Sequence, residues 1–579
     1  MTDFERRFAA FFDEYIDLQP VAATAIGDHR HDGAWPDGSE KGRAARVAFA
    51  ERWLIAFEGF DADALSAHDA IDRDLVTMDL EASRFADIEL REESWNPLAW
   101  VYLLGEGLFP LIVRAFAPLA ERLASVAARL EGMPELLDGA REALVGLPGK
   151  PVGRFQTETA LAQLPGITEL IGDALAESER AAPDDPAVAA IGPRLEKAAD
   201  VARKALAAFE THLRDVVLPG SEGDARLGAD LFARKMRHTM RSEALTPERI
   251  LAAADREFTA VRAEMVRLAR TMWPTWHPDQ PLPDDDAPLV RGVLDAIAAE
   301  HPDAADLLDY CRAENDRIET FCREHDLIGL VDDPLDIRWT PVFLRASGGA
   351  MLISPGPLDH GERSFFAISP MPDDWTPERR ESYLREDNDR MLRLLTIHEA
   401  VPGHYLQGVY ANRSASLPRA IFWSGLFAEG WAVYVTQVMM DAGYGADDPA
   451  LMLTHWKFYL RSITNAIIDS RIQCDGMTED EAVTLMVEGG FQEEAEARAK
   501  YSRARLSSTQ LSTYFAGSME MWDIELEVRR RAAVDPSIAA RALPGGFGET
   551  PGFRYRAHLE SVIGHGSPPT SLLRRILLG

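Results

Sequence analysis

Apolar residues recur every three to four positions through most of the first 330 residues, and this spacing limits what the chain can fold into. The run 117–146 shows the period clearly, with one break near Pro134, and the alanine-rich segments 189–217 and 246–271 repeat it. Such a period gives an α-helix one apolar face, which must be buried against other helices. We therefore predict a helical region over residues 1–330.

The pattern changes near residue 331. Short β-favouring runs separated by glycine and proline follow, IRWTPVFL, AMLI and FFAI. The helical pattern then resumes over 376–438, 446–495 and 496–532. We predict a mainly α fold with a small β-sheet or hairpin. Within it, the segment 346–356 is either an edge strand to which a peptide adds its own strand or a plain structural hairpin.

Charge and cysteine content narrow the partners and the compartment. The 579 residues contain 94 acidic and 61 basic side chains, a net charge of −33. We expect no nucleic-acid partner and no adhesion to anionic membranes, because both need clustered Lys and Arg. Three cysteines are too few for a disulfide framework. The first twenty residues have charges among their apolar positions and no continuous apolar run, so we predict a cytoplasmic protein.

The stretch RMLRLLTIHEAVPGHYLQ, residues 390–407, contains the most informative polar side chains. His398 and Glu399 end an apolar helical run, and His404 follows six residues after His398. In the HExxH arrangement, two histidines at i and i+4 share a helix face and bind zinc, while the Glu activates water. At about 100° per residue, a spacing of six turns His404 roughly 120° away from His398, so a regular helix cannot present both to one metal.

Pro402 and Gly403 lie between the two histidines and offer two outcomes. A kink or bulge there would bring His404 back toward His398. Alternatively, Pro402 ends the helix and the two histidines are unrelated.

Glu429 is the one charged side chain in the apolar stretch FWSGLFAEGWAVY, residues 422–434. A carboxylate buried alone costs several kcal/mol, so it must be paired or bound to a metal. It follows His398 by 31 residues. With His398 and His404 it makes a candidate mononuclear zinc site, whereas the alternative pairs it with an arginine such as Arg419 or Arg471.

Two motifs, HEAVPGHYLQ and FAEGWAVY, resemble the signature of the domain-of-unknown-function 885 family, HExxPGHxxQ followed by EGWAxY. The segments 17–33 and 510–517 also resemble parts of that family. The family is grouped with zinc metallopeptidases of the gluzincin type. The resemblance implies a large bilobed, metallopeptidase-like fold, in which residues 1–330 cover a cleft and residues 331–579 carry the catalytic site beside the small β element.

The resemblance also implies roles for particular residues. His398, His404 and Glu429 would bind one zinc ion and Glu399 would act as general base. Tyr514 would stabilise the oxyanion, or it packs in an aromatic core. Many relatives have histidines where this chain has Tyr405 and Gln473, which puts substrate choice and catalysis in doubt.

These features predict a zinc-dependent hydrolase, a metallopeptidase that cleaves short peptides. The alternatives are hydrolysis of a non-peptide amide, a catalytically inactive metal- or peptide-binding protein, and a helical structural protein without metal. The sequence does not indicate an oligomeric state, and imidazole and carboxylate ligands suit several divalent ions.

Overall fold

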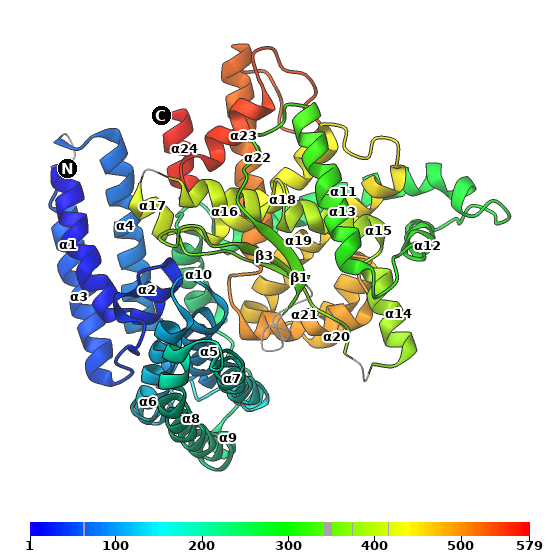
Figure 1. The fold of residues 1–579 in the computed structure, drawn as a ribbon. Helices are drawn as coiled ribbons and strands as arrows, with labels where there is room; N and C mark the ends of the chain where they lie inside the picture. The colour runs from blue at the N-terminus through cyan, green and yellow to red at the C-terminus, as the bar shows by residue number, and fades with distance from the viewer. Residues whose placement is uncertain (62–63, 341–349, 373–374, 415) are drawn as a thin grey trace. The chain divides into compact units, whose positions relative to one another are not determined.

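A computed structural model describes residues 1–61, 64–340, 350–372, 375–414 and 416–579. In these residues the chain is mainly helical and has one small three-stranded sheet, which confirms the predicted mainly α fold with a small β element (Figure 1). The chain divides into two compact units. Of the described residues, the first unit contains 1–226 and 355–363, and the second contains the remainder. The main boundary therefore falls after Arg226, earlier than the change of sequence pattern near residue 331.

The first unit is made of helices whose apolar faces pack together. Its amino-terminal helices bury a cluster of aromatic side chains, in which Phe11 contacts Phe49, Trp53 and Phe57. The elements are α1 (Asp3–Leu18), α2 (Pro20–Ile26), η1 (His29–His31), α3 (Glu40–Glu58), α4 (Ala67–Phe85), η3 (Ala86–Leu90), η4 (Glu92–Ser94), α5 (Pro97–Val113), α6 (Leu119–Ala143), α7 (Arg154–Ala181), α8 (Pro186–His212), η5 (Leu213–Val217) and α9 (Leu218–Gly220).

The second unit contains the sheet and the longer buried helices. Its elements are α10 (Gly228–Met240), α11 (Pro247–Trp276), α12 (Asp286–Ala298), α13 (Leu307–Glu324), β1 (Leu335–Trp339), β2 (Ala350–Ile353), β3 (Ser364–Ile368), α14 (Pro377–Glu386), α15 (Asp389–Glu399), α16 (His404–Asn412), α17 (Leu417–Ile421), α18 (Gly425–Asp441), α19 (Pro449–Asp475), α20 (Glu479–Thr484), η7 (Leu485–Gly489), α21 (Glu494–Leu506), α22 (Ser512–Ala533), α23 (Tyr555–Ile563) and α24 (Thr570–Leu578).

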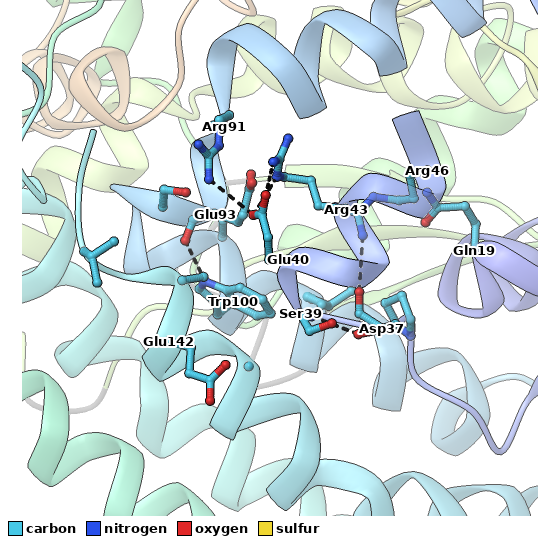
Figure 2. A pocket seen from close by; sticks show the side chains of 18 residues that line it. Gln19, Asp37, Ser39, Glu40, Arg43, Arg46, Arg91, Glu93, Trp100 and Glu142 are labelled. Carbon is cyan, nitrogen blue, oxygen red and sulfur yellow. Dashed lines mark hydrogen bonds and ion pairs between the residues drawn. The ribbon is translucent and has the colours of Figure 1, made fainter. Parts of the chain in front are cut away.

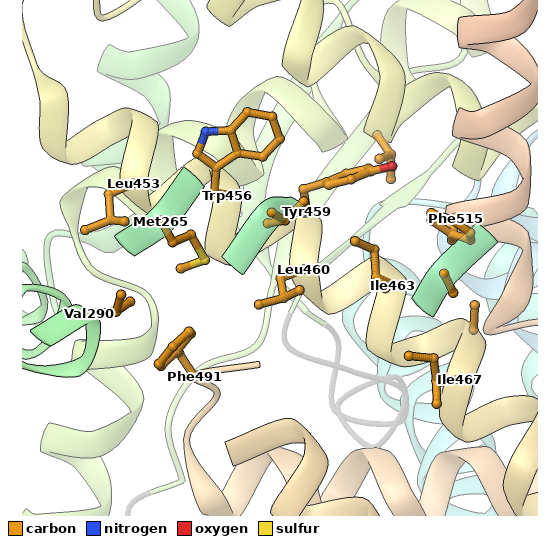
Figure 3. Packing of buried hydrophobic residues seen from close by; sticks show 14 of the residues in the cluster. Met265, Val290, Leu453, Trp456, Tyr459, Leu460, Ile463, Ile467, Phe491 and Phe515 are labelled. Atoms are coloured by element: carbon orange, nitrogen blue, oxygen red, sulfur yellow. The ribbon is translucent and has the colours of Figure 1, made fainter. Parts of the chain in front are cut away.

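Two hydrophobic clusters hold the second unit together. One joins α11, α12, α19 and α22 and includes Met265, Trp456, Tyr459 and Phe515 (Figure 3). The other joins α13, α15, α16, α18, α22 and α23 around Trp431. Because α18 packs into the second cluster along most of its length, its apolar sequence is explained by burial inside the unit.

The sheet has the strand order β1-β3-β2, with β1 parallel and β2 antiparallel to the central strand β3. It packs on α13 and α15 through Ile337, Phe366, Leu392 and their neighbours. The sheet thus lies next to the helix that carries His398, as predicted. Residues 341–349 of the β-favouring segment, including 346–349 of the predicted edge strand, lie outside the described residues.

No single described helix has the length and apolar character to cross a membrane. One bent pair, Ala67–Ser94 with Pro97–Val113, meets that test by length and composition alone.

Candidate metal centre

The helical backbone is interrupted between Glu399 and His404. The Asn388 side chain caps α15 by accepting from two backbone N–H groups, and α15 ends at Glu399. A new helix, α16, begins at His404. The helix therefore ends before Pro402, but the two histidines are not unrelated, because the break leaves their rings 4.8 Å apart, centre to centre.

Gly403 allows the close turn between the two helices. A Cβ atom at this position would lie 1.9 Å from the His398 carbonyl oxygen, so any larger residue would force the turn open. Trp431 of α18 donates its ring N–H to the Pro402 carbonyl oxygen at 3.0 Å, which fixes the turn against the next helix.

Glu429 of α18 lies against both histidines. Its Oε2 atom is 3.8 Å from His398 Nε2 and 3.4 Å from His404 Nε2. One ligand atom from each residue lies within 4.8 Å of the others, and no second group of three such side chains converges in the described part of the chain. Tetrahedral zinc with bonds of about 2.1 Å would set its ligand atoms about 3.4 Å apart. The spacing therefore fits one small cation.

The surroundings set the protonation of these ligands. Burial lowers the pKa of His398 to about 3, which keeps its ring neutral and able to coordinate. Burial also acts against a charged His404, but the hydrogen bond and charge of Glu429 outweigh it and raise the His404 pKa. For Glu429, burial is likewise outweighed by the two histidines and Tyr514, which lower its pKa.

Among the described residues, none makes a well-formed hydrogen bond with His398 Nδ1 or with Glu429 Oε2, and Glu429 Oε2 has only the looser ion-pair contacts with the two imidazoles. Since buried carboxylate oxygens are almost always hydrogen-bonded or metal-bound, the space between Glu429 Oε2 and the two imidazoles is where a cation fits.

Glu399 follows His398 directly at the end of α15. Burial raises the pKa of its carboxyl to about 7, and a backbone hydrogen bond from Leu352 of β2 acts in the opposite direction. The adjoining sheet therefore positions Glu399 next to the ligands.

Tyr514 lies in the first turn of α22 and is half-buried. Burial and the charge of Glu429 raise the pKa of its hydroxyl, while Arg503, 3.5 Å from the hydroxyl oxygen, acts in the opposite direction. Tyr514 thus lies beside Glu429, as a group that stabilises charge at this site must.

Sequence reasoning missed several residues around the site. On α19, Phe458 packs edge-on against the His398 ring at 5.6 Å, and the charge of Arg461 contributes to lowering the His398 pKa. Arg461 pairs with Glu386 and Glu496. Lys457 and Arg461, four residues apart in the strongly apolar stretch around Trp456 and Phe458, were the available signal for a buried charge cluster here.

The two departures from the family pattern are engaged in internal bonds. Tyr405 is buried and donates its hydroxyl to the Asp333 carbonyl oxygen. Gln473 is also buried, donates to the Ala504 carbonyl at 2.9 Å and accepts from the Leu227 N–H at 3.0 Å. Arg471, the candidate replacement, instead faces Asp255 at 3.7 Å. All three therefore have structural partners within the unit.

The fold and site define a helical protein with a candidate two-histidine, one-glutamate metal centre. The chain matches the model of a family described as a bacterial protein of unknown function (DUF885) over residues 20–577, and it belongs to this family. No curated protein matches it.

Two solved structures are similar over nearly their whole length. One, described as "a putative lipoprotein of unknown function" from Shewanella oneidensis, is 29% identical, with a TM-score of 0.82 and 100% of each chain covered. The other, "the putative lipoprotein from Colwellia psychrerythraea", is 14% identical, with a TM-score of 0.77, and covers 99% of this chain and 98% of its own. The second shares the fold alone.

Proposed function

We propose that this protein is a zinc-dependent hydrolase of the gluzincin type, a metallopeptidase that cleaves short peptides. The observation that carries the proposal is the convergence of His398, His404 and Glu429, with a carboxylate oxygen 3.4 and 3.8 Å from the two imidazole nitrogens. Two imidazoles that can bind in their neutral form, together with one carboxylate, are the ligand set of many catalytic zinc sites.

Zinc, when bound by these three side chains, would supply a Lewis acid that polarises water and a substrate carbonyl. Glu399 would accept a proton from the attacking water and later donate it to the leaving amine. The Glu399 pKa of about 7 suits a group that must both accept and donate a proton near neutral pH.

Tyr514 would donate its hydroxyl proton in a hydrogen bond to the oxyanion that develops on the substrate carbonyl. Its raised pKa keeps the hydroxyl protonated. The strand β2, whose Leu352 N–H contacts Glu399, would guide an extended peptide backbone past the general base.

The test begins with the metal. We expect the full-length protein to bind about one equivalent of zinc by elemental analysis, and His398→Ala to lose it. The matched control is His455→Ala, because His455 is also a buried histidine but its Nε2 bonds to Gln437 at 2.6 Å. Zinc loss in both variants, or in neither, would contradict the assigned ligands.

Turnover is tested separately. Glu399→Gln should keep zinc and lose cleavage of a mixed library of short peptides, measured by mass spectrometry. If the wild type holds zinc but cleaves no peptide, a library of non-peptide amides follows. No turnover of either would leave a metal- or peptide-binding protein as the better conclusion.

The cellular location is part of the same proposal. We keep a cytoplasmic location, although two similar structures are described as lipoproteins. Fractionation of the source cells, with antibody detection in soluble and membrane fractions, decides it.

A further inference from the structure

A cavity of about 440 Å³ lies within the first unit, and its lining includes none of the candidate metal-centre residues. It is lined by side chains of α3, η4, α5 and α6 and by the segments that join them (Figure 2). Its volume is in the range of small-molecule sites, about 300–1,000 Å³. One wall is apolar and consists of Ala99, Trp100, Leu103, Ala143 and Val145.

The lining also includes the polar residues Arg91, Glu93 and Ser94, which are close together in the sequence. Among the described residues, none forms a hydrogen bond with the buried atoms Arg91 Nε, Glu93 Oε1 and Ser94 Oγ. A buried polar atom is costly to the fold unless a partner is supplied. These three neighbouring atoms therefore offer hydrogen-bonding positions to a ligand that reaches them.

The backbone around these three residues is irregular. The helix α4 continues into the π-helix η3, Arg91 then takes a left-handed conformation with φ 45°, and the short 3-10 helix η4 follows. Non-glycine residues rarely adopt this conformation, and π-helical turns occur often at functional sites.

The other two arginines of the cavity are already neutralised. Arg43 bonds to Glu40 and to the Asp87 carbonyl oxygen. Arg46 makes a close pair with the Asp87 carboxylate at 2.7 Å. Within the described part of the chain, the ion pair of Arg91 is a looser 3.6 Å contact with the mostly exposed Glu40, and its charge also acts on Glu93. Arg91 is therefore the cation best placed to take an anion from a ligand.

Acidic groups line the same cavity. Burial raises the pKa of Glu93, whose free Oε1 would gain from a cationic donor. Glu142 lies on the other side of Trp100 from Arg91 (Figure 2). A ligand for this cavity must therefore bring an anion, a cation and an apolar group together.

We propose that this cavity binds a small zwitterion with an apolar side chain, an α-amino acid or a short peptide with free termini. The ligand carboxylate pairs with Arg91, its ammonium group with Glu93, and its side chain packs on Trp100 and Leu103. Ser94 completes the polar lining with its hydroxyl. The site is separate from the candidate metal centre and does not depend on its chemistry.

The test is calorimetric titration of the full-length protein with L-leucine and with L-leucyl-L-leucine, in the Glu399→Gln background so that no probe is consumed. N-acetylated and C-amidated forms of the dipeptide remove one charge at a time. The variants are Arg91→Ala, Arg91→Lys and Glu93→Gln. The matched control is Arg84→Ala, an arginine of α4 that faces Glu51 at 3.3 Å and does not line the cavity.

We expect L-leucine or L-leucyl-L-leucine, the probes with free termini, to bind with a Kd in the millimolar range or lower. Arg91→Ala should weaken it about tenfold or more, since charge-assisted hydrogen bonds are among the strongest in proteins. The amidated dipeptide should be insensitive to Arg91→Ala, and the N-acetylated one insensitive to Glu93→Gln. Arg91→Lys, which keeps the charge without the Nε donor, should lie between wild type and Arg91→Ala.

Three results would overturn the proposal. The first is no saturable binding of either free probe at millimolar concentration. The second is binding that Arg84→Ala weakens as much as Arg91→Ala. The third is binding lost in His398→Ala but kept in Arg91→Ala, which would place the probe at the metal centre.

Discussion

Replacing Gly517 by alanine should open the helix crossing that holds Glu429 and Tyr514 together. At this crossing, α18 and α22 touch backbone to backbone, with Gly430 directly after Glu429 and Gly517 three residues after Tyr514. A Cβ atom on Gly517 would lie 2.1 Å from the Leu426 carbonyl oxygen and 2.7 Å from the Gly430 Cα. Neither neighbour is a flexible side chain, so the helices themselves must move.

The size of the effect follows from those distances. Ordinary contact begins at 3.4 Å, so the helices must separate locally by 3.4 − 2.1 = 1.3 Å. Overpacking of this kind costs about 1–3 kcal/mol or more. Alanine regains up to about 1 kcal/mol of helix propensity. Because backbone atoms must move, we take the upper end of the overpacking cost and expect a net loss of about 2 kcal/mol in the free energy of unfolding, and a displaced Tyr514 hydroxyl.

The assay is urea unfolding followed by circular dichroism, with Gly425→Ala as the control. Gly425 also lies on α18, but a Cβ placed there would meet no atom of another described element within 4 Å. The control should therefore be as stable as the wild type or slightly more stable. If Gly517→Ala proves as stable as Gly425→Ala, the crossing does not hold the helices as tightly as the distances imply. Zinc affinity, measured on folded protein, should fall only in Gly517→Ala.

Three further outcomes are expected. Burial raises the pKa of Glu257 from 4.5 to about 7. Because the buried carboxyl becomes charged as pH rises through this interval, the free energy of unfolding should fall, by up to about 3 kcal/mol once the pH is above 7. Glu257→Gln, which can still accept from Tyr459, should flatten the pH dependence of the urea midpoint, and an unchanged slope would refute the shift. Chelation should lower the melting temperature of the wild type but not of His398→Ala, in calorimetric scans at equal protein concentration. Tyr514→Phe should reduce kcat about 10²–10³-fold with zinc retained, and an unchanged kcat would leave Tyr514 a packing residue.

The ligand residues could be predicted from the sequence because they are polar side chains in or beside apolar runs. His398 and Glu399 end an apolar run, and Glu429 is the single charge in another. Their arrangement could not be predicted in the same way. The turn after Glu399 depends on how closely Gly403 approaches the His398 carbonyl and on a hydrogen bond from Trp431, 29 positions beyond Pro402. Neither contact leaves a periodic signal.

The division into compact units shows a similar limit. Helical periodicity predicts helices on both sides of Arg226 equally well, so this periodicity does not indicate the unit boundary at Arg226. The segment 355–363 returns to the first unit, where Asp359 bonds to His29 at 2.9 Å across 330 positions of sequence. Such a return depends on pairing between distant polar residues, which composition does not reveal.

The candidate ligands are placed by hydrophobic packing, and this bears on what the metal would contribute. One cluster contains Ile397 before His398, Leu406 after His404, and Phe427 and Trp431 on either side of Glu429. Each buried apolar side chain contributes about 1.5–3 kcal/mol, so four of them outweigh the cost of orienting three polar groups. Small zinc domains instead fold only with their metal, because they lack such a core. In this protein the helices would hold the ligand geometry without the ion, so metal binding should add stability to a fold that already exists.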